Sequence, residues 1–374
     1  MRERRSGRRV LIAAICTTAL WALVLQAVKP ERFLAGANDF AQLYAGATLI
    51  GTPGLYSVEA NERVHRETLG GVMPSVYYSR LPFYAWMLRP LAGLPYRTAY
   101  WTFQAMSVAC LVWFLWTFVR DRFDLAVFAF LYPPLVFTPF NGQDVSIVLA
   151  LAAAGYLLME RERPFTAGLV WSLCAIKPHL VLLLPVVLIM HRKWRALAGG
   201  AAGGAVLIAL CYLAQGGNWM AEYLALLGSS ELHPNPQLMP NLQAVGAALP
   251  ALPAGWAVAM ASVLMTAVAA VAFRKSEHWA EAFALSLPAS LLISVHAYAQ
   301  DTLLLLLPLV LLSRLAAQPA MVRFAALMTM PLTPVLVLVG APWSAVYPAL
   351  LAAWVTAGAL RGRNAKSGAD PCTI

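Results

Sequence analysis

The sequence has 374 residues, of which 60% are hydrophobic and 12% are charged, and its mean hydropathy is +0.67. Soluble globular domains carry about twice that fraction of charged residues. The composition predicts an integral membrane protein and excludes a large soluble domain, a disordered chain and a secreted disulfide scaffold. Function is therefore expected to reside in the loops and in polar residues within the membrane.

The net charge of +10 does not indicate nucleic-acid binding. Lys and Arg concentrate in the cytoplasmic loops of membrane proteins, and the positive excess here falls on the segments that the predicted topology places in the cytoplasm. The five cysteines lie in apolar segments or in the tail and form no C-x-x-C pair. We interpret them as small core hydrophobes.

Hydropathy predicts about twelve transmembrane helices, with both termini in the cytoplasm. The first apolar run is too long for a cleaved signal peptide and lacks its A-x-A-like site. The predicted spans are 10–28, 99–119, 125–140, 144–159, 165–178, 179–190, 196–214, 252–273, 279–295, 298–313, 323–340 and 344–360. The short pair 165–178 and 179–190 is either two crossings or a hairpin that stops part-way through the bilayer.

Two extracytoplasmic loops, 29–98 and 215–251, are long enough to build a site. The segment 82–95 in the first is too short and too rich in proline to cross, so we expect an interfacial or re-entrant helix there. The second loop contains an amphipathic stretch, NLQAVGAAL. We interpret the chain as a single integral membrane domain over 1–374, with a cytoplasmic tail at 361–374.

Asp39 is the candidate catalytic residue. It lies in the first extracytoplasmic loop between apolar neighbours, and partial desolvation raises the pKa of a carboxylate toward the range of a general base. The alternative is a helix N-cap that opens the segment FAQLYAGATLI. The local pattern by itself favours the cap.

Lys177 is the first candidate for binding a phosphate. It precedes Pro178 and His179 inside an apolar stretch, and ionisable residues at membrane depth are functional candidates by default. The alternative is a side chain that extends to the far interface. Arg80, on the extracytoplasmic side, is a further candidate.

Two polar turns between predicted spans complete the candidate set. His296 is suited to donate to a phosphate, with Asp301 orienting it, although a water-facing turn explains both residues equally well. The amides of Asn141 and Gln143 flank Gly142 and are suited to bind sugar hydroxyls or phosphate oxygens, whereas a simple turn explains them nearly as well.

These elements, in this order, resemble the polyprenyl-phosphate-dependent membrane glycosyltransferases of family 87, within the GT-C fold. The resemblance covers about residues 10–340. Two departures, Leu81-Pro82 in place of paired prolines and Ser294-Val295-His296 in place of Ser-Pro-His, leave the loop shape and the acceptor open. The resemblance is carried by Asn38-Asp39-Phe40 with Tyr44, Leu55-Tyr56, the segment from Tyr78 to Phe83, Asn141-Gly142-Gln143, Lys177-Pro178 with Trp194, and Ser294 to Asp301.

The resemblance implies an all-α polytopic membrane enzyme of GT-C type in a bacterial plasma membrane. Its donor would be a polyprenyl-phosphate sugar, often mannose, and its acceptor a lipid or glycan. Transfer would be inverting, with Asp39 as general base. The implied phosphate-binding residues are Lys177, His296 and Arg80, and the implied substrate-binding residues are Asn38, Tyr44, Tyr78, Asn141, Gln143, His179 and Asp301.

The topology favours the same kind of donor. Nucleotide sugars are cytoplasmic, so an extracytoplasmic site needs a sugar carried by a lipid, which enters from the bilayer. No cofactor is expected, and the spacing of Asp39, Asp144 and Asp301 does not require a metal.

Two other classes of function stay open. A transporter or flippase for a polyprenyl-linked sugar also suits twelve spans and a lysine at membrane depth. A non-catalytic subunit of a cell-envelope assembly is the third interpretation. Only the enzyme requires Asp39 for the formation of a new glycosidic bond.

Overall fold

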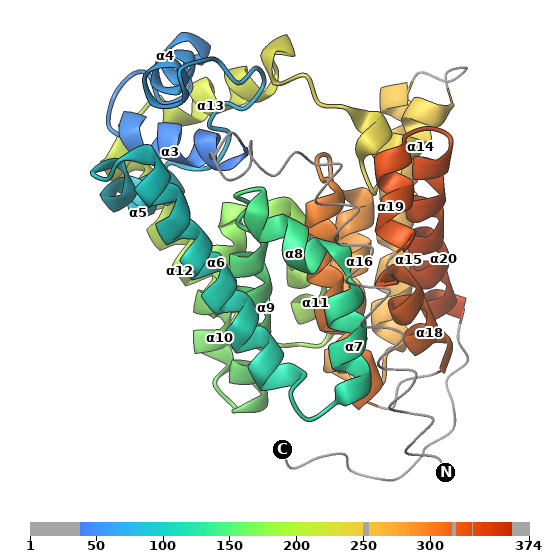
Figure 1. Cartoon of the computed structure of the whole chain (residues 1–374). Helices are drawn as coiled ribbons and strands as arrows, with labels where there is room; N and C mark the ends of the chain where they lie inside the picture. The colour runs from blue at the N-terminus through green and yellow to red at the C-terminus, as the bar shows by residue number, and fades with distance from the viewer. Residues whose placement is uncertain (1–37, 250–253, 316–318, 331, 361–374) are drawn as a thin grey trace. The chain divides into compact units, whose positions relative to one another are not determined.

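The computed structural model describes residues 38–249, 254–315, 319–330 and 332–360. Within these residues it contains 18 α-helices, α3 to α20, six short 3-10 helices and no β-strand. The expectation of an all-helical protein is confirmed. The helices form two compact units. Figure 1 labels the helices along the chain.

The first unit comprises Met1–Arg120, Leu135–Lys177 and Ala198–Pro234. In it α6 packs against α9, α9 against α10, and α3 against both α4 and α5. Its described helices are α3 (Phe40–Leu49), α4 (Val58–Leu69), α5 (Pro82–Ala92), α6 (Tyr96–Phe118), most of α8 (Pro133–Phe140), α9 (Val145–Glu160), α10 (Pro164–Ser172), η1 (Leu173–Ile176), most of α12 (Trp194–Gln215), α13 (Trp219–Leu227) and η3 (Ser230–Leu232).

The second unit comprises Asp121–Pro134, Pro178–Leu197 and Asn235–Ile374. In it α15 packs against α16 and α20, and α16 packs against α17. Its described helices are α7 (Phe123–Leu131), η2 (Pro178–Val181), α11 (Leu184–Met190), η4 (Pro236–Leu238), α14 (Leu242–Ala248), α15 (Ala254–Lys275), α16 (Trp279–Ile293), η5 (Ala299–Leu305), α17 (Leu306–Arg314), α18 (Pro319–Met328), α19 (Leu332–Val339), η6 (Trp343–Ala345) and α20 (Val346–Leu360).

Several helices carry large apolar side chains on their outer surface. Examples are Trp116 on α6, which is 65% exposed, Leu213 on α12, which is 83% exposed, and Trp256 on α15, which is 76% exposed. Water penalises such surfaces, whereas lipid tails accommodate them. The apolar helices identify an integral membrane protein.

The structure does not show twelve transmembrane helices. Among the described residues, four helical segments are long and apolar enough to cross a membrane, or five if α18 and α19, bent by 46°, form one span. The four segments are Tyr96–Phe118, Trp194–Gln215, Gly255–Lys275 and Trp343–Leu360. The predicted span 10–28 and the tail 361–374 lie outside the described residues.

Backbone breaks divide two of the other predicted spans. The segment 125–140 is divided between α7 and α8 at Pro133 and Pro134, and 298–313 is divided between the 3-10 helix η5 and α17. Proline lacks the amide hydrogen that continues a helix, and it disfavours helical geometry in the residue before it. Hydropathy counts apolar residues and does not detect such breaks.

The described part of the segment that we expect to form the first extracytoplasmic loop is folded. Ser57 caps α4 by accepting a hydrogen bond from the Ala60 amide, and Gly70 ends the helix with a φ of 71°. The helix α5 begins with Pro82 and has 11 residues, too few to cross a bilayer. This length is compatible with the interfacial helix expected at 82–95.

Close packing in the first unit depends on glycines of α12. A Cβ at Gly199 would overlap the Phe165 carbonyl oxygen, and a Cβ at Gly203 would overlap the Ser172 hydroxyl. Small residues four apart allow membrane helices to approach closely. These glycines therefore pack α12 against α10 within one chain.

Replacing Gly199 by Leu is expected to destabilise the protein by about 1–3 kcal/mol, because the new side chain would displace the backbone of α10. Gly204→Leu is the matched control, since a Cβ at Gly204 meets nothing within 4 Å. Thermal unfolding of both variants in detergent measures the difference. Equal melting temperatures would contradict this packing role.

Candidate functional site

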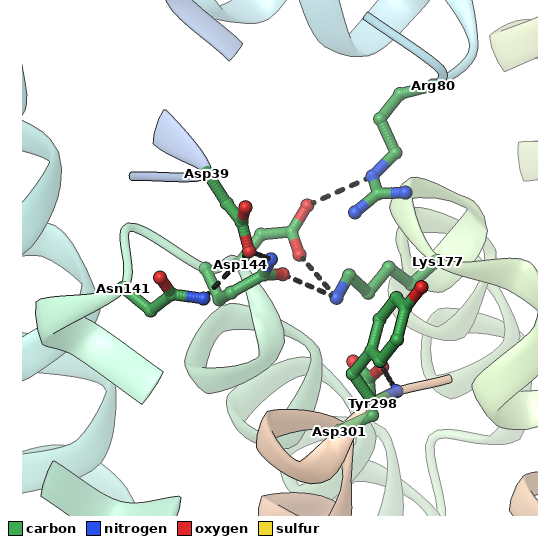
Figure 2. A network of polar contacts seen from close by, with 8 residues as sticks. Asp39, Arg80, Asn141, Asp144, Lys177, Tyr298 and Asp301 are labelled. Carbon is green, nitrogen blue, oxygen red and sulfur yellow. Dashed lines mark hydrogen bonds and ion pairs between the residues drawn. The ribbon is translucent and has the colours of Figure 1, made fainter. Parts of the chain in front are cut away.

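Asp39 binds two amides from a loop far away in the sequence. Its Oδ2 accepts a hydrogen bond from Asn141 Nδ2 at 2.7 Å and a second from Gln143 Nε2. Figure 2 shows that the other carboxylate oxygen, Oδ1, points away from the amides. Although Asp39 precedes α3, its side chain makes no capping hydrogen bond. The geometry therefore does not support the N-cap interpretation.

The backbone around Asn38 and Gly142 brings these groups together. Asn38 Nδ2 donates to the Phe140 carbonyl oxygen at 3.2 Å, and Asn38 Oδ1 accepts from the Phe40 amide at 3.0 Å. Gly142 has a φ of 68°, and a Cβ there would overlap Asn38 and Phe40. Only glycine combines this conformation with so close an approach. Asn38, predicted to bind substrate, has a structural role in these contacts.

Lys177 lies on the other side of Gln143. Its Nζ donates to Gln143 Oε1 at 2.7 Å. Because a lysine ammonium is only a donor, the amide oxygen of Gln143 must face Lys177 and the amide nitrogen must face Asp39. Gln143 thus connects the cation to the carboxylate. The Lys177 side chain is only 3% exposed, which contradicts the alternative of a side chain extending to the interface.

A second carboxylate, Asp144, joins two cations. Its Oδ1 lies 3.3 Å from Lys177 Nζ, and its Oδ2 lies 3.4 Å from Arg80 Nε (Figure 2). Like Asp39, Asp144 occupies the position before a helix but does not cap it with its side chain. The sequence interpretation gave Asp144 no role in the site and named it only as lacking the spacing of a metal ligand. The rule that buried ionisable residues in membrane proteins are functional would have identified it.

The pKa of Asp39 is raised above its ordinary value of 3.8. Burial of the carboxylate is the main cause, because it disfavours the charged form. The hydrogen bond from Gln143, the charges of Lys177 and Arg80, and the hydrogen bond from Asn141 oppose this shift without reversing it. The carboxylate is therefore a stronger base than an aspartate in water.

Other predicted site residues of the first unit serve the scaffold. The Tyr44 hydroxyl donates to the Leu94 carbonyl oxygen at 2.9 Å, and the Tyr78 hydroxyl donates to the Leu81 carbonyl oxygen at 2.8 Å. Tyr78 is fully buried, and its amide donates to Asn61 Oδ1 at 3.0 Å. These contacts anchor the segment that carries Arg80.

The remaining predicted site residues lie in the second unit. The rings of His179 and His296 are 6.3 Å apart, and the ring of His296 is 5.0 Å from that of Tyr298. Asp301 Oδ2 accepts a hydrogen bond from the Tyr298 amide at 2.8 Å. The structure thus groups His179 with His296 and gives Asp301 a role in shaping the turn before η5.

Over the part of the chain that the structure describes, no three His, Cys, Asp or Glu side chains gather as metal ligands. The candidate site consists of Asp39, Asp144, Arg80 and Lys177, together with the amides of Asn141 and Gln143. We call these six residues, all from the first unit, the polar cluster.

The stability of Asp39→Asn relative to that of the wild type is expected to increase as the pH rises from acidic to neutral. Because the pKa of Asp39 is raised on folding, the native state holds its proton up to a higher pH than the unfolded chain. Wild-type stability therefore falls as the pH rises above 3.8 through the raised pKa, and asparagine lacks this penalty.

Thermal unfolding in detergent across this pH range measures the difference. Asp124→Asn is the control, because Arg122 lowers the pKa of the exposed Asp124 and its loss should give a small effect of opposite sign. If the melting temperatures of Asp39→Asn and wild type differ equally at every pH, the raised pKa is wrong.

Comparison with protein families gives one match. The model of glycosyltransferase family 87 matches residues 81–299, which include Asn141, Gln143, Asp144 and Lys177. Comparison with curated proteins and with solved structures found no match. Because the family model covers more than half of the sequence, the chain belongs to glycosyltransferase family 87 and is a membrane glycosyltransferase.

Proposed function

We propose that this enzyme transfers a hexose, with mannose as the first candidate, from a polyprenyl-phosphate donor to a lipid or glycan acceptor. The reaction takes place on the extracytoplasmic face of a bacterial plasma membrane and inverts the anomeric carbon. The observation that carries this proposal is a carboxylate of raised pKa, Asp39, held in one cluster with Lys177 and Arg80. This combination supplies a base and cations for an anionic leaving group.

In the proposed step, Asp39 takes the proton of the acceptor hydroxyl. The acceptor oxygen forms a bond to the anomeric carbon while the bond from that carbon to the phosphate oxygen breaks. The electron pair of the broken bond leaves with the polyprenyl phosphate. Inversion follows from a single displacement, since the acceptor attacks the face opposite the leaving group.

The charges of the polar cluster suit this step. Before transfer, Asp39 is negative and Lys177 is connected to it through Gln143. As the proton moves, Asp39 becomes neutral and the phosphate gains the negative charge. Lys177 and Arg80 are buried or nearly so, with 3% and 11% of their side chains exposed, so their attraction for the new charge is only weakly screened.

The twelve-span topology and the roles of His179, His296 and Asp301 stay predictions. Lys177 and Arg80 are the proposed phosphate ligands because they belong to the polar cluster. His296 keeps its proposed phosphate role, and His179 and Asp301 their proposed substrate roles, on the sequence resemblance.

Asp39→Asn is expected to lower kcat/KM about 10²–10⁴-fold, because asparagine cannot accept the proton. The assay uses the purified protein in nanodiscs, radiolabelled polyprenyl-phosphate mannose and a crude envelope-lipid acceptor pool. In the wild type, activity should fall as the pH drops through the raised pKa of Asp39, since only the ionised form is a base.

Asp124→Asn, which removes an exposed carboxylate paired with Arg122, is the control and should retain wild-type activity. Transfer by Asp39→Asn at the wild-type rate would overturn the role of Asp39. If labelled lipid moves across the membrane of proteoliposomes and no new glycosidic bond forms, the protein is instead a flippase.

A further inference from the structure

The buried carboxylate Asp144 has no part in the proposed chemical step. It is 1% exposed and lies between the two cations to which we assign the donor phosphate. A carboxylate and a phosphate are both anions with oxygen atoms that accept from Lys and Arg. Asp144 therefore occupies the environment that a phosphate requires.

The contacts of Asp144 with these cations are long. Charge-assisted hydrogen bonds from nitrogen to oxygen are usually about 2.7–2.9 Å, whereas the two ion pairs measure 3.3 Å and 3.4 Å. Lys177 makes its short hydrogen bond to Gln143 instead, at 2.7 Å. Both of these ion pairs are therefore longer than a short charge-assisted hydrogen bond.

A third polar group interacts electrostatically with the same carboxylate. The Tyr84 hydroxyl on α5 is buried and has no hydrogen-bond partner among the described residues. Burial raises the pKa of Tyr84, and the negative charge of Asp144 adds to this rise. A neutral tyrosine hydroxyl is a hydrogen-bond donor, so Tyr84 adds an unused donor to the surroundings of Asp144.

We propose that Asp144 is an internal counter-ion that competes with the polyprenyl phosphate for Arg80 and Lys177. This inference rests on the proposed function. After transfer, the leaving phosphate carries one more negative charge than the donor phosphodiester, and two unneutralised buried cations would retain it. Asp144 lowers that affinity and so allows the product to leave.

Binding of undecaprenyl phosphate to the protein in nanodiscs tests this proposal without requiring any transfer. Asp144→Asn should bind the phosphate at least about tenfold more tightly than the wild type, because removing a buried like charge near the phosphate strengthens its attraction to the cations. Asp144→Glu keeps the charge and should bind like the wild type. Asp124→Asn is the control for loss of a carboxylate that does not belong to the polar cluster.

Turnover gives a second readout. In Asp144→Asn, kcat should fall and undecaprenyl phosphate should inhibit at lower concentration, because product release becomes slower. A residue that only supports the fold would give the opposite result, namely weaker phosphate binding. Equal or weaker binding by a folded Asp144→Asn protein overturns the proposal.

A second pair of variants covers the case in which Asp144→Asn does not fold. Lys177→Gln with Asp144→Asn removes one buried charge of each sign, and it should bind undecaprenyl phosphate more tightly than Lys177→Gln alone. If the wild type does not prefer undecaprenyl phosphate to neutral undecaprenol, the proposed donor class fails. If it does and neither Asp144→Asn variant binds more tightly than its parent, only the role of Asp144 fails.

Discussion

The polar cluster depends on the burial of opposite charges in one place. Taking a single lysine or aspartate out of water costs several kcal/mol, and the cost is recovered only when a partner of opposite charge and further hydrogen bonds are present. Here two carboxylates and two cations are linked through Lys177, which contacts both Gln143 and Asp144. A change in any one of these charges alters the energy of the other three, so the four groups form one electrostatic unit.

The local backbone brings these charges together. Asp39 and Asp144 both stand immediately before a helix, yet neither side chain caps it. Each helix therefore forgoes a stabilising hydrogen bond, and the carboxylate is used in the polar cluster instead. Gly142 permits the close approach of the two segments, because any side chain there would collide with Asn38 or Phe40. Stability is sacrificed at these positions, as is common at functional sites.

Some of this arrangement was predictable from the sequence and some was not. Composition indicates a membrane protein, and the motif order indicates the family, because both depend on residue types alone. The pairing of Asp39 with Asn141 joins residues 102 positions apart, which no local pattern encodes. The breaks within predicted spans were unpredictable for a related reason: hydropathy sums apolar residues, whereas Pro133 and Pro134 interrupt the helix that those residues were expected to form.

Lys177 and Asp144 illustrate how burial changes the meaning of a charged residue. At a surface, an ion pair of 3.3 Å contributes little, because water screens it. In the polar cluster the same pair is almost fully excluded from water, so any charge that enters or leaves alters the energy of all the others. In the proposed reaction, transfer of a proton to Asp39 and of an electron pair to phosphate moves one negative charge across this cluster without changing its total. A site whose cations are already shared between carboxylates is suited to that exchange, because neither the start nor the end of the reaction leaves a buried charge without a partner.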